Sequence, residues 1–115
     1  MSGKNNISQK VAVTIVVPTY NERLNIRPLV SLLENALTGI DWEVVFVDDD
    51  SPDGTADEVR ELAKSISNIR VIHRVGRRGL SGACIEGILS SAGPYVAVMD
   101  GDLQHDEKIL PLMLD

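Results

Sequence analysis

Val11-Ala12-Val13-Thr14-Ile15-Val16-Val17 is a nearly unbroken apolar run, mostly β-branched, that stops at Pro18. A run without polar alternation predicts a strand that is buried on both faces of its sheet. Three more apolar runs predict further strands at residues 42–47, 69–74 and 95–99. The chain therefore contains at least four segments suited to the interior of one sheet.

Helices are predicted between these strands. Apolar residues recur at helical spacing from Ile26 to Leu37, and Gly39 ends the pattern. Thr55 followed by Glu58 is a capping-box pattern for a second helix. Two more helices are predicted, around residues 83–92 and over 107–114. Strands that alternate with helices predict an α/β fold: a doubly wound, Rossmann-like parallel sheet with helices on both faces.

Length and composition indicate one domain. The chain has 115 residues, of which 43% are hydrophobic but only 3% aromatic, so aliphatic side chains must form the core. Residues 1–10 are polar and read as a flexible tail ahead of a folded portion at 11–115. The net charge of -6 disfavours nucleic acid as a partner. Cys84 is the single cysteine, which excludes an intrachain disulfide and fits a reducing compartment.

We expect a cytoplasmic protein. No apolar run approaches the length of a membrane span, and the first ten residues have no apolar signal core. Association with the cytoplasmic face of a membrane is compatible with this pattern. One basic cluster interrupts the acidic composition within nine residues: Arg70, His73, Arg74, Arg77 and Arg78. It is either a solvated charge run around a loop or a contact for an anion such as phosphate.

Polar side chains follow three of the predicted strands where ligands bind in open parallel sheets, beyond the carboxyl ends. The first strand ends in Pro18-Thr19-Tyr20-Asn21-Glu22, the second in Asp48-Asp49-Asp50, and the fourth in Asp100-Gly101-Asp102-Leu103-Gln104-His105. Acids gathered there repel one another unless a cation is present. Mg²⁺ or Mn²⁺ prefers oxygen ligands, which Asp100, Asp102 and Gln104 offer.

Each of these motifs alone is also an ordinary turn composition, and only their joint placement favours a site. Other sites are disfavoured by spacing. Gly76, Gly79 and Gly82 follow the third strand and do not form a dinucleotide fingerprint, and no Walker-type phosphate loop is present. His73 and His105 are too isolated to form a zinc site.

In this order the motifs resemble those of family-2 inverting glycosyltransferases, and within them the dolichol-phosphate (polyprenol-phosphate) mannosyltransferases. The resemblance rests on residues 18–22, 47–55, 79–83 and 99–105, and it extends over roughly residues 11–114. It implies the N-terminal, nucleotide-sugar-binding part of a GT-A fold. Gly101 departs from the family, which usually has alanine between the two aspartates.

The resemblance also implies roles for individual residues. Pro18, Tyr20 and Glu22 would line the nucleoside pocket, and Val47 with Asp49 would contact the base or ribose. Asp100, Gly101 and Asp102 would contact the donor, Asp102 being catalytic. Asp100, Asp102 and Gln104 would hold the Mg²⁺ or Mn²⁺ that bridges the diphosphate and replaces an acid catalyst. The implied donor is GDP-mannose, and the implied acceptor is a polyprenol phosphate.

Alternatives remain open at this stage. A polyprenyl-phosphate glucosyltransferase or another family-2 enzyme would use a UDP-sugar. A non-catalytic, receiver-like module would also bind Mg²⁺ at strand ends but needs a lysine at a late strand end, and a nucleotidyltransferase needs a basic, glycine-rich loop after the first strand. We expect the 115-residue chain to bind nucleotide and metal weakly, to transfer little or no sugar, and to self-associate through exposed apolar surface.

Overall fold

The computed structural model describes residues 11–76, 79–99 and 110–113, so the predicted tail at residues 1–10 lies outside the described residues. It contains a five-stranded sheet with the strand order β3-β2-β1-β4-β5. The strands are β1 (Val13–Thr19), β2 (Trp42–Asp48), β3 (Ile69–His73), β4 (Tyr95–Val98) and β5 (Leu110–Met113). The first four are parallel to one another, which confirms the predicted parallel sheet.

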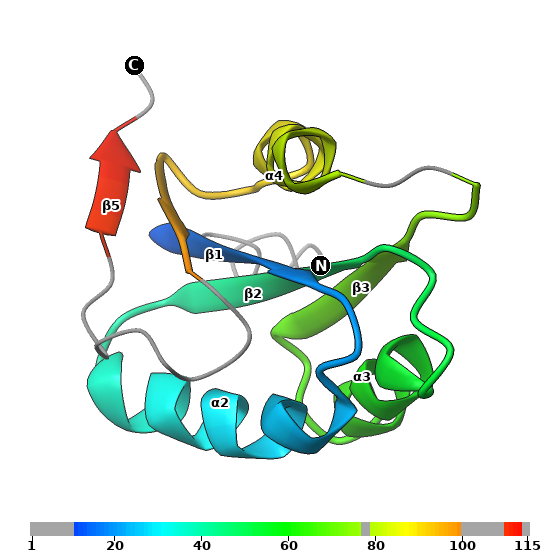
Figure 1. Cartoon of the computed structure of the whole chain (residues 1–115). Coiled ribbons are helices and arrows are strands. Elements are labelled where there is room, and N and C mark those ends of the chain that lie inside the picture. The colour runs from blue at the N-terminus through cyan, green and yellow to red at the C-terminus, as the bar shows by residue number, and fades with distance from the viewer. Residues whose placement is uncertain (1–10, 77–78, 100–109, 114–115) are drawn as a thin grey trace, which may run out of the picture.

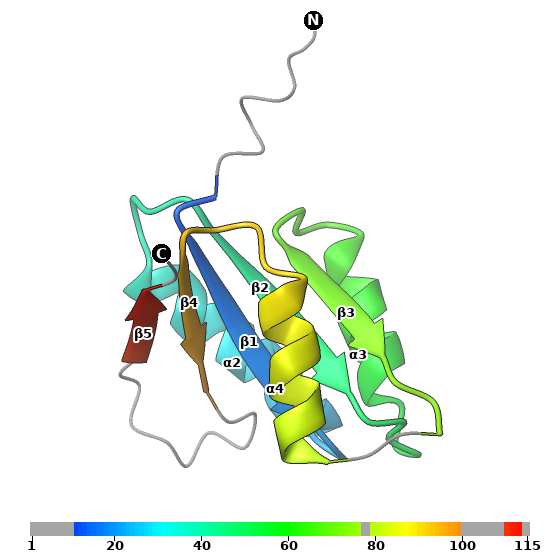
Figure 2. The ribbon, with the colours of Figure 1, turned by 90° about the horizontal axis from the view of Figure 1, so that it is seen from above.

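Helices cover both faces of the sheet, also as predicted. Figure 1 shows α2 (Arg23–Ala36) and α3 (Thr55–Ala63) below the sheet and α4 (Leu80–Leu89) above it. Seen from above, α4 crosses over β1 and β2 (Figure 2). In the described part of the chain, no helix is long and apolar enough to cross a membrane.

The strands at the centre are apolar on both sides because each face has its own core. Along β2, Val44 and Phe46 belong to the core under α2 and α3, whereas Val45 and Val47 belong to the core under α4. All four are fully buried. Since successive side chains in a strand point to opposite faces, the same alternation carries the residues after Val47 to opposite sides of the sheet. Asp48 follows toward α2 and α3, and Asp49 toward α4.

We expected Pro18 to end the first strand, but it lies inside β1. The Val16 carbonyl accepts a hydrogen bond from the Met99 N–H on the β4 side (3.1 Å), and Pro18, two residues later, faces the same side. The β1–β4 pairing ends at Val16 and Val98. An N–H at position 18 would therefore have no acceptor on β4, and proline, which has no N–H, costs no hydrogen bond there. The strand therefore continues to Thr19.

The predicted helix over residues 107–114 is wrong for its described part. Leu110–Met113 forms β5, which pairs antiparallel with β4, and Pro111 lies opposite Ala97. A proline inside a helix removes a backbone hydrogen bond, whereas an edge strand tolerates it. The open edge of β4 supplies backbone partners that an isolated short helix would lack. Four parallel strands therefore carry one antiparallel edge strand.

Candidate functional site

The site predicted from the strand ends lies at the carboxyl edge of the sheet, where the order of connection reverses between β1 and β4. The register places Thr19 opposite Asp48, so the ends of β1 and β2 coincide. The Asp49 N–H donates to the Thr19 carbonyl at 3.1 Å and continues the contact beyond the strands. Two of the three predicted strand ends are thus adjacent, as expected.

Asp48 serves the structure of this edge. It is fully buried, and its Oδ1 accepts hydrogen bonds from the hydroxyls of Thr19 (2.9 Å) and Ser51 (2.6 Å). Its Oδ2 accepts the Ser51 N–H at 3.0 Å. Ser51 Oγ in turn accepts the Asn21 N–H at 2.8 Å. Asp48 therefore ties the β1 and β2 loops together, and both its oxygens are already in use.

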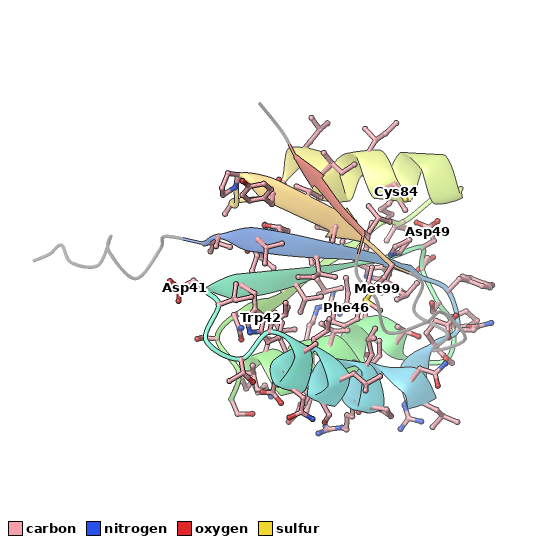
Figure 3. All side chains as sticks on the ribbon, turned by 90° about the vertical axis from the view of Figure 1, so that its left-hand side faces the viewer. Asp41, Trp42, Phe46, Asp49, Cys84 and Met99 are labelled. Atoms are coloured by element: carbon pink, nitrogen blue, oxygen red, sulfur yellow. The ribbon has the colours of Figure 1, made fainter. Side chains whose placement is uncertain are left out.

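Asp49 is placed differently. It is 8% exposed, and its Oδ2 accepts the Gly79 N–H at 3.1 Å. Its Oδ1 lies 3.3 Å from Arg74 Nη1 as an ion pair, but forms no hydrogen bond within the described residues. Figure 3 shows Asp49 at the far end of β2 from Asp41 and Trp42. Asp49 Oδ1 is thus a buried carboxylate oxygen without a hydrogen bond, at the edge of the sheet where ligands bind in this class of fold.

A pocket of about 160 Å³ lies directly beside this carboxylate. It is lined by Pro18, Thr19, Tyr20 and Asp49, and the Tyr20 side chain is 40% exposed. Pockets for drug-sized ligands start at roughly 300 Å³, so this one has room for a single ring system and not for a whole nucleotide-sugar. Two residues predicted to line the nucleoside pocket, Pro18 and Tyr20, are therefore brought together with Asp49, which was predicted to contact the base or ribose. Thr19 also lines the pocket and was not predicted to, although it stands between Pro18 and Tyr20, which were.

Two other predicted contact residues have different surroundings. The Glu22 N–H donates to Thr55 Oγ1 at 3.1 Å, and its Oε1 accepts from Asn25 Nδ2 at 2.9 Å. Glu22 is the residue just before α2 and is half-buried. It was predicted to line the nucleoside pocket with Tyr20, but it is not among the residues that line the pocket described above. The Val47 side chain is fully buried under α4. Only its main chain is left to meet a ligand.

The turn between β2 and α3 is held by Asp53. Its Oδ1 accepts both the backbone N–H (3.0 Å) and the hydroxyl of Thr55, and its Oδ2 accepts the Arg23 N–H at 3.1 Å. Desolvation alone would raise the pKa of Asp53, but these hydrogen bonds outweigh it and the pKa is lowered. The predicted capping box is wrong, because Gly54 precedes the helix and Thr55 is its first residue. Thr55 bonds to neighbouring loops instead.

The three described members of the basic cluster, Arg70, His73 and Arg74, all lie against carboxylates. Arg70 pairs with Glu43, and His73 Nε2 lies 2.8 Å from Asp50 Oδ1. Arg74 is only 5% exposed and so is not part of a solvated run. The remaining members, Arg77 and Arg78, lie outside the described residues. A buried arginine could not be predicted here from the sequence, because the partners of Arg74 are distant in the chain.

The predicted metal ligands Asp100, Asp102 and Gln104, with Gly101, lie outside the described residues. Met99 is the last residue before them, and its bond to Val16 shows that the fourth strand end runs to the same edge as β1. Within residues 11–76, 79–99 and 110–113, no group of three His, Cys, Asp or Glu side chains is arranged to hold a metal ion. Asp48, Asp49 and Asp50 each have protein partners of their own.

Comparison with known sequences gives consistent matches. The sequence model of glycosyl transferase family 2 matches residues 14–115. A dolichol-phosphate mannosyltransferase from Pyrococcus furiosus is 43% identical over 103 residues, which are 90% of this chain and 29% of that protein. Another, from Saccharomyces cerevisiae, is 38% identical over 108 residues, covering 91% of this chain and 40% of that protein. The chain therefore spans well under half the length of these relatives.

Solved structures agree. A mannosyltransferase from Pyrobaculum calidifontis, in complex with GDP-Man and Mn²⁺, has a TM-score of 0.69 at 30% identity, covering 81% of this chain and 28% of that one. Staphylococcus aureus TarS in complex with UDP-GlcNAc has a TM-score of 0.63 at 28% identity, covering 80% of this chain and 27% of that one. These likenesses confirm the predicted fold, the N-terminal part of a GT-A glycosyltransferase, and leave no support for the receiver-like or nucleotidyltransferase alternatives.

Proposed function

The chain belongs to glycosyl transferase family 2, and on that premise we propose that it binds the donor of a mannosyl transfer from GDP-mannose to a polyprenol phosphate. The names of the curated relatives support the acceptor class, and the Pyrobaculum structure with GDP-Man supports the donor. The chain covers only 29% and 40% of those relatives. The transfer reaction is therefore proposed for a full-length protein that contains these residues, and donor binding for these residues themselves.

The observation that carries this proposal is the pocket beside Asp49. Pro18, Thr19 and Tyr20 give it an apolar wall and one aromatic ring, and its size suits a nucleobase. The Asp49 carboxylate is an acceptor without a proton to give, so it favours a base edge that presents N–H donors. Guanine offers two such donors side by side. Tyr20 stands at the open side of the pocket, where a base could lie against its ring.

A divalent cation fits the residues that follow Met99. The donor set of Asp100, Asp102 and Gln104 is made of carboxylate and amide oxygens, the ligands that Mg²⁺ and Mn²⁺ prefer. Within the described residues no group of three acidic or metal-binding side chains is arranged to hold an ion, so we assign the cation to that loop. When bound, such a cation neutralises the charge that develops on a departing nucleoside diphosphate. Asp102 would be the carboxylate on which this depends most.

The acceptor needs little help from this part of the protein. A lipid phosphate is already an anion at neutral pH, so it can attack the anomeric carbon without a general base. Attack from the face opposite the diphosphate inverts the configuration at that carbon. The acidic residues of the carboxyl edge would then serve the donor alone.

A second candidate function is transfer from a UDP-sugar, which the likeness to TarS in complex with UDP-GlcNAc favours. Uracil also presents an N–H that could donate a hydrogen bond to Asp49. The lining of the pocket therefore does not by itself distinguish guanine from uracil. Calorimetric titration with GDP, UDP and ADP, each with Mn²⁺ or with a chelator, separates the two. The proposal predicts the tightest binding for GDP with Mn²⁺, and preference for UDP would replace it with the second candidate.

The metal assignment is tested by Asp102→Asn in the same titration. We expect the affinity for GDP with Mn²⁺ to fall by roughly 100-fold, since a cation-bridged diphosphate loses its anchor. Asp41→Asn is the matched control, because Asp41 is exposed at the opposite end of β2 and should change nothing. Metal-dependent GDP binding that survives in Asp102→Asn would refute the assignment.

A further inference from the structure

Arg74 is a buried arginine between two carboxylates. Its Nη1 lies 3.3 Å from Asp49 Oδ1, and its Nε lies 3.0 Å from Glu86 Oε1 on α4. The same Nη1 donates to the Gly79 carbonyl at 3.2 Å, and the Arg74 N–H donates to the Asp48 carbonyl at 2.8 Å. Arg74 thus joins the end of β3 to the end of β2 and to the start of α4. A charged side chain buried this deeply is uncommon unless every partner is fixed.

The glycines after β3 make room for this arginine. A Cβ on Gly82 would lie 2.8 Å from Arg74 Nη2, so any larger residue would displace the guanidinium. Gly79 has φ +133°, a conformation that side chains disfavour, and its N–H and carbonyl bond respectively to Asp49 and Arg74. The glycine-studded stretch that did not match a phosphate-binding fingerprint therefore has a structural purpose. Gly79 and Gly82 together form a slot for Arg74 next to the Asp49 carboxylate.

We propose that Arg74 is the positioning residue for nucleoside recognition, which fixes the Asp49 carboxylate at the pocket through a slot formed by Gly79 and Gly82. The inference rests on the proposed function, because it takes Asp49 to be the group that meets the base. Arg74 holds Oδ1 and the Gly79 N–H holds Oδ2, so the carboxylate is restrained from both sides. It stays aimed along the pocket wall formed by Pro18, Thr19 and Tyr20.

Glu86 completes the arrangement by supplying a second negative charge. Because Arg74 contacts two carboxylates, its planar guanidinium is held in one orientation, which a lysine could not reproduce with a single ammonium. Loosening that orientation frees Asp49 to rotate away from the pocket. The nucleoside would then lose its acceptor, whereas the diphosphate, held through the cation, would keep its contacts. The two halves of the donor should respond differently to the same substitution.

The test compares two probes, GDP with Mn²⁺ and inorganic pyrophosphate with Mn²⁺, by calorimetry on the 115-residue chain. We expect Arg74→Met to weaken GDP binding by roughly tenfold or more and to leave pyrophosphate binding unchanged. Arg74→Lys should lie between wild type and Arg74→Met. Arg70→Met is the matched control: it removes the arginine–carboxylate pair between Arg70 of β3 and Glu43, at the opposite edge, and should leave both affinities unchanged.

Gly82→Ala guards against a variant that fails to fold, because it shifts the guanidinium without deleting its charge. It should weaken GDP binding several-fold and spare pyrophosphate. Wild-type GDP affinity in folded Arg74→Met and Gly82→Ala would overturn the inference while the proposed function stands. Equal losses for both probes would also overturn it, since they indicate general loosening. If the wild-type chain bound neither probe, the proposed function itself would fail.

Discussion

Two buried acidic residues at opposite ends of β2, Glu43 and Asp49, differ in how many hydrogen-bond donors surround them. Glu43, near the amino end, is 8% exposed and surrounded by donors. Its Oε2 accepts the Thr14 hydroxyl (2.7 Å) and the Ala92 N–H (2.9 Å), and Arg70 Nε lies 3.3 Å from Oε1. Every donor that reaches it comes from a different element. At the amino edge, the Glu43 carboxylate therefore has a hydrogen-bond donor on both of its oxygens and links three segments of the fold.

Asp49, at the carboxyl end, has equal burial but fewer donors. One of its oxygens accepts the Gly79 N–H, and the other has only the ion pair with Arg74. It also borders the pocket, which Glu43 does not. Equal burial thus accompanies different chemistry: a saturated carboxylate contributes stability, and an incompletely satisfied one beside a cavity is suited to a ligand. We propose that this difference, rather than burial, distinguishes Glu43 as a structural acid from Asp49 as an acid that meets a ligand.

The largest expected effect is the loss of stability in Glu43→Ala. Truncation leaves the Thr14 hydroxyl and the Ala92 N–H without their buried acceptor, which should cost about 3 kcal/mol in the free energy of unfolding. Urea unfolding measures it. Glu34→Ala, exposed on α2, is the control and should change stability by less than about 0.5 kcal/mol. GDP affinity should be unchanged in both. A cost below about 1 kcal/mol would show that the network at the amino edge is not structural.

Asp49→Asn should give the reverse result. The amide replaces one acceptor oxygen with a donor, so we expect GDP affinity to fall by roughly tenfold, about 1.4 kcal/mol. Its cost in unfolding free energy should be smaller than that of Glu43→Ala. Calorimetry and urea unfolding on the same samples provide both numbers, with Asp41→Asn as the exposed control. A variant that lost stability as Glu43→Ala does while keeping its GDP affinity would abolish the distinction between the two edges.

The smallest expected effect is a change in how the free energy of unfolding depends on pH below 4.5 when Glu43 is replaced. Burial alone would raise the pKa of Glu43, but hydrogen bonds from Thr14, Arg70 and the Ala92 N–H, with the charge of Arg70, outweigh it and lower the pKa below its ordinary 4.5. A lowered folded-state pKa stabilises the fold above pH 4.5, and this contribution disappears as pH falls through the folded value. Unfolding free energy should thus fall more steeply below pH 4.5 in wild type than in Glu43→Gln.

Asp53 acts in the same direction at the carboxyl edge, since its pKa is lowered from 3.8. Its side chain is exposed, so water screens its interactions and Asp53→Asn should flatten the pH dependence less than Glu43→Gln. Parallel pH profiles for wild type and Glu43→Gln would contradict the assigned cause of acid sensitivity.

Much of the fold was predictable because the central strands carry continuous apolar runs. Val44 to Val47 could be recognised as buried on both faces, and the helical spacing between such runs fixes a parallel sheet. The convergence of the β1 and β2 ends followed from that sheet. The last element could not be recognised in this way, because a short apolar segment fits a helix or a strand equally well. Only the open edge of β4 decides for β5.

The division of labour within Asp48-Asp49-Asp50 was also hidden. Alternation along β2 sends Asp48 and Asp49 to opposite faces, but this can be known only once the end of the strand is known. The role of Arg74 was harder still. Its neighbours in sequence suggest a solvated basic loop, and the carboxylates that bury it come from β2 and α4. Pairing across a fold leaves no local signal.

The most direct test of the account is a ¹⁵N–¹H NMR titration of the chain with GDP and Mg²⁺. We predict that the largest amide shift changes occur at Thr19, Tyr20, Asp49 and Gly79, around the pocket and its carboxylate. The chemical shifts of amides near Thr14, Glu43 and Arg70 should not change. Shift changes that cluster at the amino edge, or none at saturating GDP, would contradict the assignment of the carboxyl edge as the nucleoside site.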